Sequence, residues 1–414
     1  MHEKPPAVAS HLKPRPDIPC QQIWWNNAIF FTSVHLGAAL GIYYLPPSSM
    51  PFRTLALTII NWQLAIFGIT VGYHRLWSHR SFDANVVVRF VLAILGTAGF
   101  QGSIKWWCLR HRLHHRYTDD PVHDPYAATR GMLYAHMGWI FYKPNYGHMH
   151  LIDRSDLEDD IIVRLQHRYY VPLAIIVGFI FPVFLGKTWH DPWGVLIWVG
   201  LVSRLMIWHC IFLVNSLAHW HGLQPYSDED TSKTNLIVAF LVAGEGNHNY
   251  HHAFPFDYRS DPSPFAWDPS KWLIAGLRKL GFVKRLRRAR EDEIQRANAG
   301  MMRETAFETK CFAEKLEIWS ADDAMSFVTS SLRPCLLLID GYFVDATAYA
   351  NDHPGGAHIL HKYAIVDLSG QQFKDDEPVM KDATEAFGKF NRHTRAARWR
   401  MKELRIAKYI GHST

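Results

Sequence analysis

Residues 52–79 read FRTLALTIINWQLAIFGITVGYHRLWSH, a long apolar run that ends in two histidines, His74 and His79. A helix needs about 20 apolar residues to cross the hydrocarbon core of a bilayer, so residues 52–73 are predicted to span a membrane. The two histidines then lie where this helix leaves the lipid. Clustered histidines at such a boundary indicate a metal ion or a group that titrates near neutral pH. The stretch therefore predicts a membrane protein with chemistry at one end of its helices.

Three further stretches, residues 23–45, 169–189 and 193–215, are also long and apolar enough to span a bilayer. The first two spans of the chain are separated by PPSSMP and the last two by a few residues around GKTWHDP, so two helical hairpins are expected. Aromatic residues stand at the segment ends, as in the interfacial belt of membrane proteins: Trp24, Trp25, Tyr43, Tyr44, Trp189 and Trp193. Residues 86–102 are interrupted by Arg89 and are predicted to be interfacial or re-entrant, and residues 236–242 are too short to span.

The distribution of positive charge predicts the orientation of these helices. Residues 74–168 hold twelve Lys and Arg, whereas the two hairpin turns carry almost none. Because cytosolic loops are enriched in Lys and Arg, residues 74–168, the chain after residue 215 and both termini are predicted to face the cytosol. The basic run RKLGFVKRLRRAR at 278–290 indicates contact with anionic lipid headgroups or a solvated helix face, so no nucleic-acid partner is expected.

The composition agrees with a polytopic protein that has large water-facing parts. Of 414 residues, 48% are hydrophobic and 14% aromatic, and the net charge is +6. The five cysteines are scattered without a CxxC pair, which favours reduced thiols over a disulfide framework. The first twenty residues are polar and proline-rich, so no cleavable signal peptide is expected.

Shifts in composition predict four regions: a polar N-terminal tail (1–22), a membrane domain (23–290), a helical linker (291–313) and a small soluble domain (314–414). In the last region we expect strands at 335–339 and 342–344 and an arginine-rich helix at 394–408. The predicted fold is mainly α, with four transmembrane helices and a cytosolic helical cap, plus a small α+β domain at the C-terminus.

Two more histidine boxes occur in the predicted cytosolic regions, HRLHH at 111–115 and HNYHH at 248–252. In an α-helix positions i, i+3 and i+4 share one face, so each box is predicted to point three imidazoles in one direction. His74 and His79, five residues apart, are not expected to share a face and are predicted to bracket a helix end. Eight histidines are too many for one tetrahedral zinc and suit two ions of a metal that imidazole prefers, such as iron, zinc, copper or nickel. Five histidines outside the boxes are expected to make structural hydrogen bonds: His35, His136, His190, His209 and His221.

Five segments resemble the acyl-CoA Δ9 desaturases, the stearoyl-CoA desaturase family: GYHRLWSHRSF, KWWCLRHRLHHRYTDDPVHDPY, RGMLYAHMGW, NSLAHWHG and GEGNHNYHHAFPFDYR. The resemblance covers roughly residues 20–290. It implies an enzyme of the endoplasmic reticulum membrane that uses O2 to insert a cis double bond at C9–C10 of saturated acyl-CoA, such as stearoyl-CoA or palmitoyl-CoA. It also implies two iron ions held by nine histidines, with Asn215 joining through a water molecule. Carried over, the histidine ligands are His74, His79, His111, His114, His115, His219, His248, His251 and His252.

Two basic residues near the second box, Arg130 and Lys143, are candidates for binding the phosphates of coenzyme A. An ordinary surface charge is the simpler account of either residue. The acyl chain of such a substrate is expected to enter an apolar tunnel between the helices while its thioester headgroup stays in water.

The C-terminal segment LLLIDGYFVDATAYANDHPGG resembles cytochrome b5. The resemblance implies a haem b held by His353 and His393, with electrons supplied by an NADH-cytochrome b5 reductase that this chain does not contain. The two histidines are 40 residues apart, longer than usual for that family, and the extra residues 367–380 are expected to form a surface loop. The alternative is a b5-like fold that has lost its haem. A desaturase with b5 fused at its C-terminus resembles the fungal-type arrangement.

Competing hypotheses remain open at this point. A related membrane di-iron hydroxylase, or a desaturase of lipid-linked acyl chains, would use the same metal site. A non-catalytic membrane haem protein that donates electrons is a third hypothesis, although such a protein would not keep nine candidate iron ligands. The segment NSLAHW and the spacing of the third box favour acyl-CoA desaturation.

Overall fold

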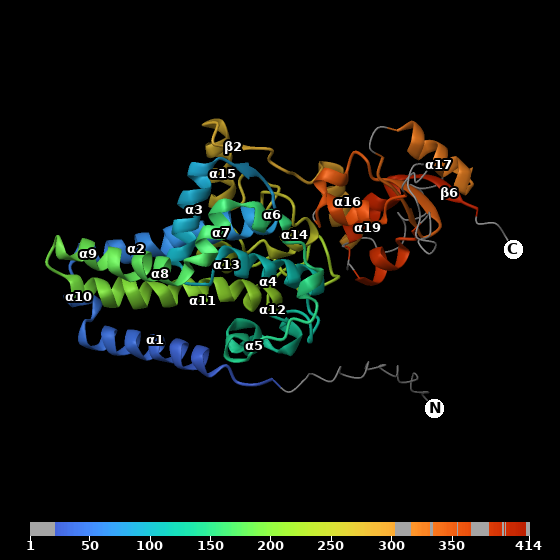
Figure 1. Ribbon diagram of the computed structural model, residues 1–414. Coiled ribbons are helices and arrows are strands. Elements are labelled where there is room, and N and C mark those ends of the chain that lie inside the picture. The colour runs from blue at the N-terminus through green and yellow to red at the C-terminus, as the bar shows by residue number, and fades with distance from the viewer. Residues whose placement is uncertain are drawn as a thin grey trace, which may run out of the picture.

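The protein is described by a computed structural model, which covers residues 21–302, 316–331, 334–353, 355–365, 381–390, 393 and 395–410. Long helices lie side by side in one bundle, and a small domain that contains α17 (Ala321–Ser330) and β6 (Arg405–Tyr409) lies beyond one end of it (Figure 1). The opposite end of the bundle is closed by the turn between α9 and α10 (Figure 1). The site described below lies between the bundle and the small domain.

Three continuous helices are long and apolar enough to cross a membrane: Phe52–Ser78, Tyr170–Lys187 and Pro192–Trp220. They consist of α and π segments that follow one another closely: α2 (Phe52–Phe67), η2 (Gly68–Ser78), α8 (Tyr170–Ile175), η6 (Ile176–Ile180), α9 (Phe181–Lys187), α10 (Pro192–Val195), η7 (Leu196–Val202), α11 (Ser203–Asn215) and α12 (Leu217–Trp220). Three of the four predicted spans are thus found. The remaining one, α1 (Trp25–Tyr44), is a 20-residue helix. Polar residues such as Asn26, Asn27 and His35 dilute its apolar character, so it is not among the helices that reach membrane-spanning hydropathy in the described residues.

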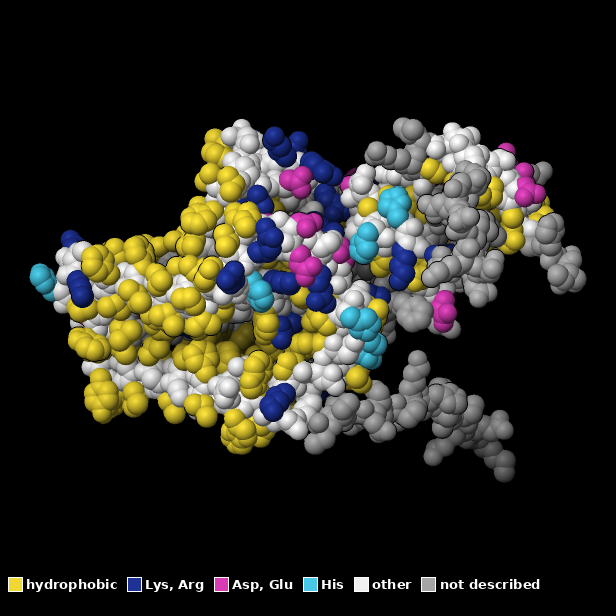
Figure 2. Space-filling view, viewed as in Figure 1, with side chains coloured by type: hydrophobic (Ala, Val, Ile, Leu, Met, Phe, Trp, Pro, Cys, Tyr) yellow, Lys and Arg dark blue, Asp and Glu magenta, His cyan; other side chains and the backbone are white. Residues whose placement is uncertain are grey.

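Apolar side chains cover the outside of the bundle. Figure 2 shows them gathered over the face formed by α8, α9 and α1. Phe181 and Phe184 on α9 are 56% and 65% exposed. Large apolar groups face outward in this way where lipid takes the place of water. The chain is therefore a membrane protein.

The helix α3 (Val86–Ala98) is about 20 Å long, too short to cross a bilayer, as predicted for an interfacial or re-entrant segment. Its C-terminal end is held by Arg204 of α11, which donates to the carbonyls of Ala98 and Gly178. Arg204 is fully buried, and its guanidinium lies 4.8 Å from the Phe100 ring. A Cβ on Gly178 would lie 2.7 Å from this guanidinium, so glycine permits the approach. A cation is favourable at a helix C-terminus, and these carbonyls supply the partners that a charge inside a membrane requires.

The cap at the end of the bundle consists of short elements: α4 (Ile104–Tyr117), α5 (Met132–His136), α6 (Ser155–Asp159), α7 (Ile161–Arg168), α13 (Leu236–Leu241), α14 (His248–Ala253), α15 (Pro269–Lys279), β1 (Asp83–Ala84) and β2 (Val283–Lys284). Single 3-10 turns connect other segments: η1 (Pro47–Ser49), η3 (Ala128–Arg130), η4 (Gly138–Phe141) and η5 (Met149–Leu151). A buried apolar cluster that includes Tyr73, Leu113 and Ile274 joins η2, α4 and α15. The end of the second span is therefore fixed directly to the cap.

The small C-terminal domain contains a four-stranded sheet in the order β3–β6–β5–β4. Its other elements are β3 (Glu317–Trp319), β4 (Leu336–Ile339), β5 (Tyr342–Asp345), η8 (Ala350–Asp352), α18 (Ala357–Tyr363), η9 (Ala386–Phe390) and α19 (Arg395–Glu403). β4 and β5 pair as an antiparallel hairpin whose turn, Asp340-Gly341, has positive φ at both residues. Asp-Gly is the sequence that such a two-residue turn favours. The α+β character and the two strands at 335–339 and 342–344 agree with the sequence.

The arginine-rich helix predicted at 394–408 is wrong over its last five residues, 404–408. The helix α19 ends at Glu403, and the chain continues as β6 between β3 and β5. Ala407 is buried and Lys408 is exposed, the alternation of a strand in a sheet, and this pairing overrides the helical composition. The predicted linker is helical over α16 (Glu291–Met302), while residues 303–313 and the predicted loop at 367–380 lie outside the described residues.

Candidate metal centre

The histidines of the three boxes are carried by elements that meet at the end of the bundle nearest the C-terminal domain (Figure 1). His74 lies on η2 and His79 directly follows it, while α4 carries the second box and α14 the third. His219 lies on α12, where the last span ends. All nine are buried except His79 and His115, which are half-buried. The structure thus brings together the nine histidines that the sequence singles out.

These nine histidines form two clusters. The first consists of His74, His79, His111, His115 and His251, and the second of His114, His219, His248 and His252. Within each cluster one ring nitrogen of every member lies within 4.8 Å of the others. The protein therefore offers two adjacent groups of nitrogen donors, whereas one metal ion would need a single group.

The boxes do not point all their imidazoles in one direction, as the sequence led us to expect. On α4, His111 and His115 face the first cluster, whereas His114 faces the second. On α14, His251 faces the first cluster and its neighbours at i−3 and i+1 face the second. Along an α-helix i+4 lies about 40° from i, and i+3 lies about 60° away on the other side. Each box helix therefore runs between the two clusters and contributes to both.

The expectation that His74 and His79 do not share a face is also wrong. The segment η2 is wound as a π-helix, and the His79 amide donates to the His74 carbonyl five residues back, at 3.1 Å. This wider winding leaves the two ring centroids 4.8 Å apart. His79 terminates the helix, so the pair does mark a helix end. Long π segments are rare and are frequently found at functional sites.

A buried carboxylate, Glu245, ties the first cluster to the rest of the fold. Its Oε2 lies 3.0 Å from His74 Nδ1, and its Oε1 accepts from Arg75 Nε at 2.9 Å. Arg75 also donates to Asp268 at 3.0 Å and to Ser260 at 2.7 Å. Burial raises the pKa of Glu245, but Arg75 and His74 outweigh burial and hold the pKa at about 2. Glu245 is therefore an anion that fixes the orientation of the His74 ring.

Carboxylates also hold the rings of the second cluster. His114 Nδ1 lies 2.8 Å from Asp124 Oδ1, and His252 Nδ1 lies 3.1 Å from Asp230 Oδ2. Burial raises the pKa of Asp230, but His252 outweighs burial and holds it well below the ordinary value. Burial lowers the pKa of His114, but Asp124 more than compensates and raises it above the ordinary value. Such partners fix the tautomer and increase the basicity of a metal-binding imidazole.

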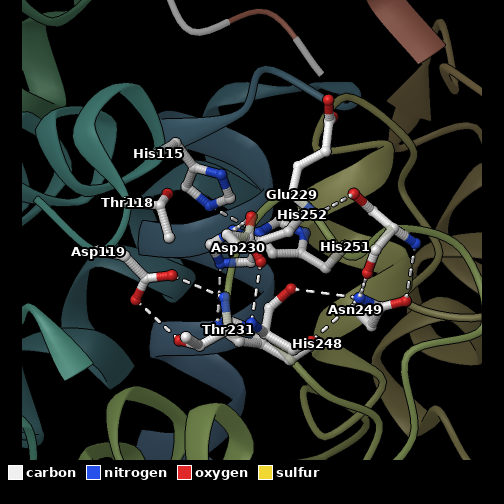
Figure 3. A network of polar contacts seen from close by, with 12 residues as sticks. His115, Thr118, Asp119, Glu229, Asp230, Thr231, His248, Asn249, His251 and His252 are labelled. Atoms are coloured by element: carbon white, nitrogen blue, oxygen red, sulfur yellow. Dashed lines mark hydrogen bonds and ion pairs between the residues drawn. The ribbon is translucent and has the colours of Figure 1, made fainter. Parts of the chain in front are cut away.

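His219 has a partner of a different kind, a threonine backed by an acid. His219 Nδ1 lies 2.8 Å from Thr231 Oγ1, and this hydroxyl donates to Asp119 Oδ1 at 2.7 Å (Figure 3). Because the Thr231 proton is given to Asp119, its oxygen accepts the proton on His219 Nδ1. The lone pair of His219 then lies on Nε2, 3.1 Å from His248 Nε2.

The donor set of both clusters fits metal ions. Burial lowers the pKa of His79, His111, His115, His248 and His251 well below ordinary values, so these rings are neutral at pH 7 and each keeps a nitrogen lone pair. Ring Nε2 atoms nevertheless face one another at 2.7–3.1 Å. The buried His114 Nε2 has no hydrogen-bond partner in the described part of the chain. The Nε2 lone pairs converge, while carboxylates and a hydroxyl hold the opposite ring nitrogens of several members. A cation at the centre of each cluster would stabilise this arrangement.

A cavity of 610 Å³ extends from the histidines into the membrane bundle. His74, His248 and Asn215 lie on its wall at the metal centre. Phe31 and Trp208 line a deeper part, since Trp208 lies seven residues before Asn215 on α11, about 10 Å along the helix. The rings of Phe31 and Trp208 are 4.5 Å apart between centroids. An apolar cavity of this size suits a long aliphatic chain.

The basic residues on this cavity differ from those proposed from the sequence. Arg130 and Lys143 are not among its lining residues and donate to side chains of the segment at 21–22. The arginines on its wall are Arg110 and Arg168. Arg110 is 7% exposed, and its guanidinium lies over the Trp106 ring and donates to the Tyr146 hydroxyl at 2.9 Å.

His353 and His393 of the C-terminal domain line a second cavity, of 470 Å³. His353 Nδ1 lies 3.3 Å from the Gly356 carbonyl and His393 Nδ1 lies 2.9 Å from the Phe387 carbonyl, which fixes the lone pair of each ring on Nε2. Burial lowers the pKa of His353 to about 4, so its ring is neutral. The two ring centroids are 6.2 Å apart. Two imidazoles that line one cavity, each with its lone pair on Nε2, fit the axial ligands of a haem.

Three histidines outside the boxes make the structural hydrogen bonds expected of them. His35 Nε2 lies 3.1 Å from His209 Nε2, and His209 Nδ1 lies 3.0 Å from His136 Nε2. His136 Nδ1 lies 2.9 Å from Ser216 Oγ. The chain of contacts connects α1, α11 and α5.

The sequence did not identify the carboxylates behind the histidines or the arginines on the cavity. Asp124 follows His114 by ten residues, and Asp230 precedes His252 by 22 residues. Separations of this size leave no helical periodicity to detect. Only Glu245, three residues before the third box, gave a local signal.

Comparison with known proteins was consistent with this site. The family model described as "Fatty acid desaturase" matches residues 48–260. The chain is 34% identical over 398 residues to Acyl-CoA desaturase 1 of Saccharomyces cerevisiae, covering 94% of this chain and 74% of that protein. It is 34% identical to the "Probable acyl-CoA desaturase" of Schizosaccharomyces pombe, covering 97% and 81%. It is also 34% identical to human Stearoyl-CoA desaturase 5, covering 67% of this chain and 85% of that protein.

Proposed function

Because the chain belongs to the fatty acid desaturase family, we propose that it is an acyl-CoA Δ9 desaturase, which inserts a cis double bond between C9 and C10 of saturated acyl-CoA. The observation that carries this proposal is the position of the two histidine clusters at one end of an apolar cavity inside a membrane bundle. The substrates are long-chain acyl-CoA, such as stearoyl-CoA or palmitoyl-CoA, and O2. The reaction converts one –CH2–CH2– unit and O2, with two electrons and two protons, into –CH=CH– and two molecules of water.

We infer that the nine histidines hold two iron ions and that Asn215 joins one of them through a water molecule. Iron in such a site supplies the activation of dioxygen that hydrogen removal from unactivated methylene groups requires. The contribution of the chain is to keep most of the imidazoles neutral by burial and to orient rings of both clusters through Glu245, Asp124 and Asp230. These carboxylates also balance the positive charge that two metal ions would bring into a buried site.

The cavity positions the substrate. Apolar walls exclude water from the acyl chain, and the rings of Phe31 and Trp208, in contact with each other, line the deeper part. We propose that the coenzyme A phosphates bind arginines at the cavity, Arg110 and Arg168, with Arg130 and Lys143 nearby as further candidates. Fixing the headgroup and bending the chain past the histidines would select the carbons that react.

Electrons are proposed to come through the C-terminal domain, residues 314–414, as a cytochrome b5-like unit with haem b on His353 and His393. The α+β fold and the shared cavity of the two histidines support this assignment. An NADH-cytochrome b5 reductase would supply the haem with single electrons. We further propose that α1 is a fourth span, and that the membrane domain (23–290) lies in the endoplasmic reticulum membrane. The polar cap and the C-terminal domain lie at one end of the bundle, and we propose that this end faces the cytosol (Figure 1). The site and both termini, with the N-terminal tail (1–22) and the helical linker (291–313), would then be cytosolic.

Product analysis tests this function. Full-length protein in membranes receives deuterium-labelled stearoyl-CoA or palmitoyl-CoA, NADH, reductase and air, and the products are identified by mass spectrometry. A 9,10-monoene that disappears in His251→Ala is expected. An alcohol product would instead identify a hydroxylase, and a monoene formed only from lipid-linked chains would identify a different substrate class. Absence of any product although the haem is reduced would leave an electron carrier.

A further inference from the structure

The second cavity is shared by the C-terminal domain and the metal centre. His353 and His393 line it from one side, and His79, His115 and His252 line it from the other. The C-terminal domain lies against this end of the bundle, beside α14 and α16 (Figure 1). The crevice that fits the haem therefore opens onto histidines of both metal clusters.

One contact connects the His353 side of this crevice to the first cluster. Gly356, whose carbonyl faces His353 Nδ1, lies against Arg80 and Asp153, since a Cβ at Gly356 would lie 2.9 Å from Asp153 Oδ2 and 3.1 Å from Arg80 Nη1. Arg80 directly follows His79 in the chain and donates to Asp153 at 2.9 Å. The backbone that holds one proposed haem ligand thus touches the residue next to a ligand of the first cluster.

A second contact connects the His393 side to the second cluster. Arg398 of α19 donates to the His393 carbonyl at 2.8 Å and forms an ion pair with Glu229. The next residue, Asp230, holds His252 Nδ1 at 3.1 Å. Figure 3 shows the Glu229 side chain directed away from the histidines, whereas Asp230 lies among them. One arginine therefore bridges the backbone of a proposed haem ligand and the segment that orients a metal ligand.

A third contact fixes α19 to the helix that precedes the C-terminal domain. Glu403 of α19 accepts from Arg290 at 2.9 Å and from Arg296 of α16. Ile294 of α16 in turn belongs to the same buried apolar cluster as Tyr250, a residue of the third histidine box. The two domains present alternating charges to each other, so the contact is complementary rather than a general attraction between one acidic and one basic surface.

We propose that these contacts form an intramolecular docking interface that places the haem crevice over the metal centre for electron transfer, and that Arg398 and Glu403 are its positioning residues. The inference rests on the proposed function and specifies how its electrons arrive. In each transfer the reduced haem loses one electron to the metal site, and NADH replaces that electron through the reductase. Two such transfers supply the two electrons that each double bond consumes. The partner of the surface around the metal clusters is thus the chain's own C-terminal domain.

Charge reversal tests the interface in the full-length holoprotein. The haem is reduced, the protein is mixed with air-saturated buffer and stearoyl-CoA, and haem reoxidation is followed by its absorbance. Arg398→Glu and Glu403→Lys are each expected to slow reoxidation at least tenfold, because like charges replace the ion pairs. The double variant Glu229→Arg/Arg398→Glu is expected to return to within threefold of the wild type. Glu317→Lys, an exposed residue of β3, is the matched control and should reoxidise at the wild-type rate.

Two further readouts separate docking from folding and from the reaction itself. The haem spectrum should keep its bis-histidine form in every variant, because the Gly356 and Phe387 carbonyls that hold the Nδ1 atoms of His353 and His393 are not changed. Cysteines placed at positions 229 and 398 should be joined by a short bismaleimide, as identified by peptide mass spectrometry, whether or not the protein forms a monoene. Wild-type reoxidation rates in Arg398→Glu, or failure of the cross-link, would overturn the docking interface. Absence of acyl-CoA-dependent reoxidation in the wild type, with the cross-link formed, would overturn the proposed function instead.

Discussion

Replacing Glu245 by glutamine is expected to destabilise the metal-free protein by about 3 kcal/mol. The carboxylate is 3% exposed and lies 3.0 Å from His74 and 2.9 Å from Arg75. Its pKa falls from an ordinary value of 4.5 to about 2, which corresponds to about 3 kcal/mol of preference for the charged, folded form. Removing one partner of a buried ion pair costs about 3–5 kcal/mol. The lower end applies because Arg75 keeps its bonds to Asp268 and Ser260.

Thermal unfolding in one detergent, with metal removed, measures this effect. Glu245→Gln is expected to lower the melting temperature by about 3–5 °C. Its affinity for Fe²⁺ should fall by about 10–100-fold, because the ring of His74 loses the group that orients it. The matched control is Glu158→Gln, whose carboxylate forms a surface ion pair with Lys105 and should leave both quantities unchanged.

The pH dependence follows from the direction of the shift. A carboxylate whose pKa is lowered by folding contributes its stability above its ordinary pKa of 4.5 and loses it as the pH falls towards 2. The difference between wild type and Glu245→Gln should therefore be constant at neutral pH and shrink below about pH 4.5. A variant that unfolds at the wild-type temperature and binds iron as tightly would show that Glu245 neither stabilises the fold nor orients His74.

Three further predictions concern the second cluster, the cavity and the C-terminal domain. Asp230→Asn removes the anion that holds His252 Nδ1 and should weaken iron binding at one of the two sites by about 10–100-fold without changing the haem spectrum; full iron occupancy in an iron titration would contradict this. Trp208→Ala enlarges the deeper part of the cavity and should shift the product profile, measured per bound iron, towards longer acyl chains; an unchanged profile would show that Trp208 does not limit chain length. His353→Ala should abolish the bis-histidine haem absorbance and NADH-dependent turnover while keeping the iron; a retained bis-histidine spectrum would exclude His353 as a ligand.

The sequence predicted which histidines come together, but not how they are distributed between two clusters. The three boxes and His219 could be gathered at one membrane face because each adjoins the end of a span or lies in a region of the same predicted orientation. Their division into two clusters depends on the rotation of α4 and α14 about their own axes. Spacing alone does not fix that rotation, because a box helix can stand beside one metal site or between two. The π winding of η2, which packs against α3 and α4, was equally hidden.

Other features escaped prediction because they depend on contacts between distant parts of the chain. Arg75 and Asp268 are 193 residues apart, and Arg398 and Glu229 lie in different domains. The C-terminal strand β6 has a helical composition, yet its place in the middle of the sheet determines its conformation. Local patterns therefore located the spans, the boxes and the first hairpin of the small domain, whereas charged residues that support the site required the assembled fold.

If the two clusters of histidines hold two iron ions, the iron content of the purified full-length protein will show both of them. The metal is measured by mass spectrometry after reconstitution under reducing conditions, in the wild type and in His251→Ala and His252→Ala, which each lose a member of a different cluster. Two irons per chain are expected in the wild type and about one in each variant, with loss of the monoene in both. A wild type that binds a single iron, or variants that keep two, would contradict this expectation.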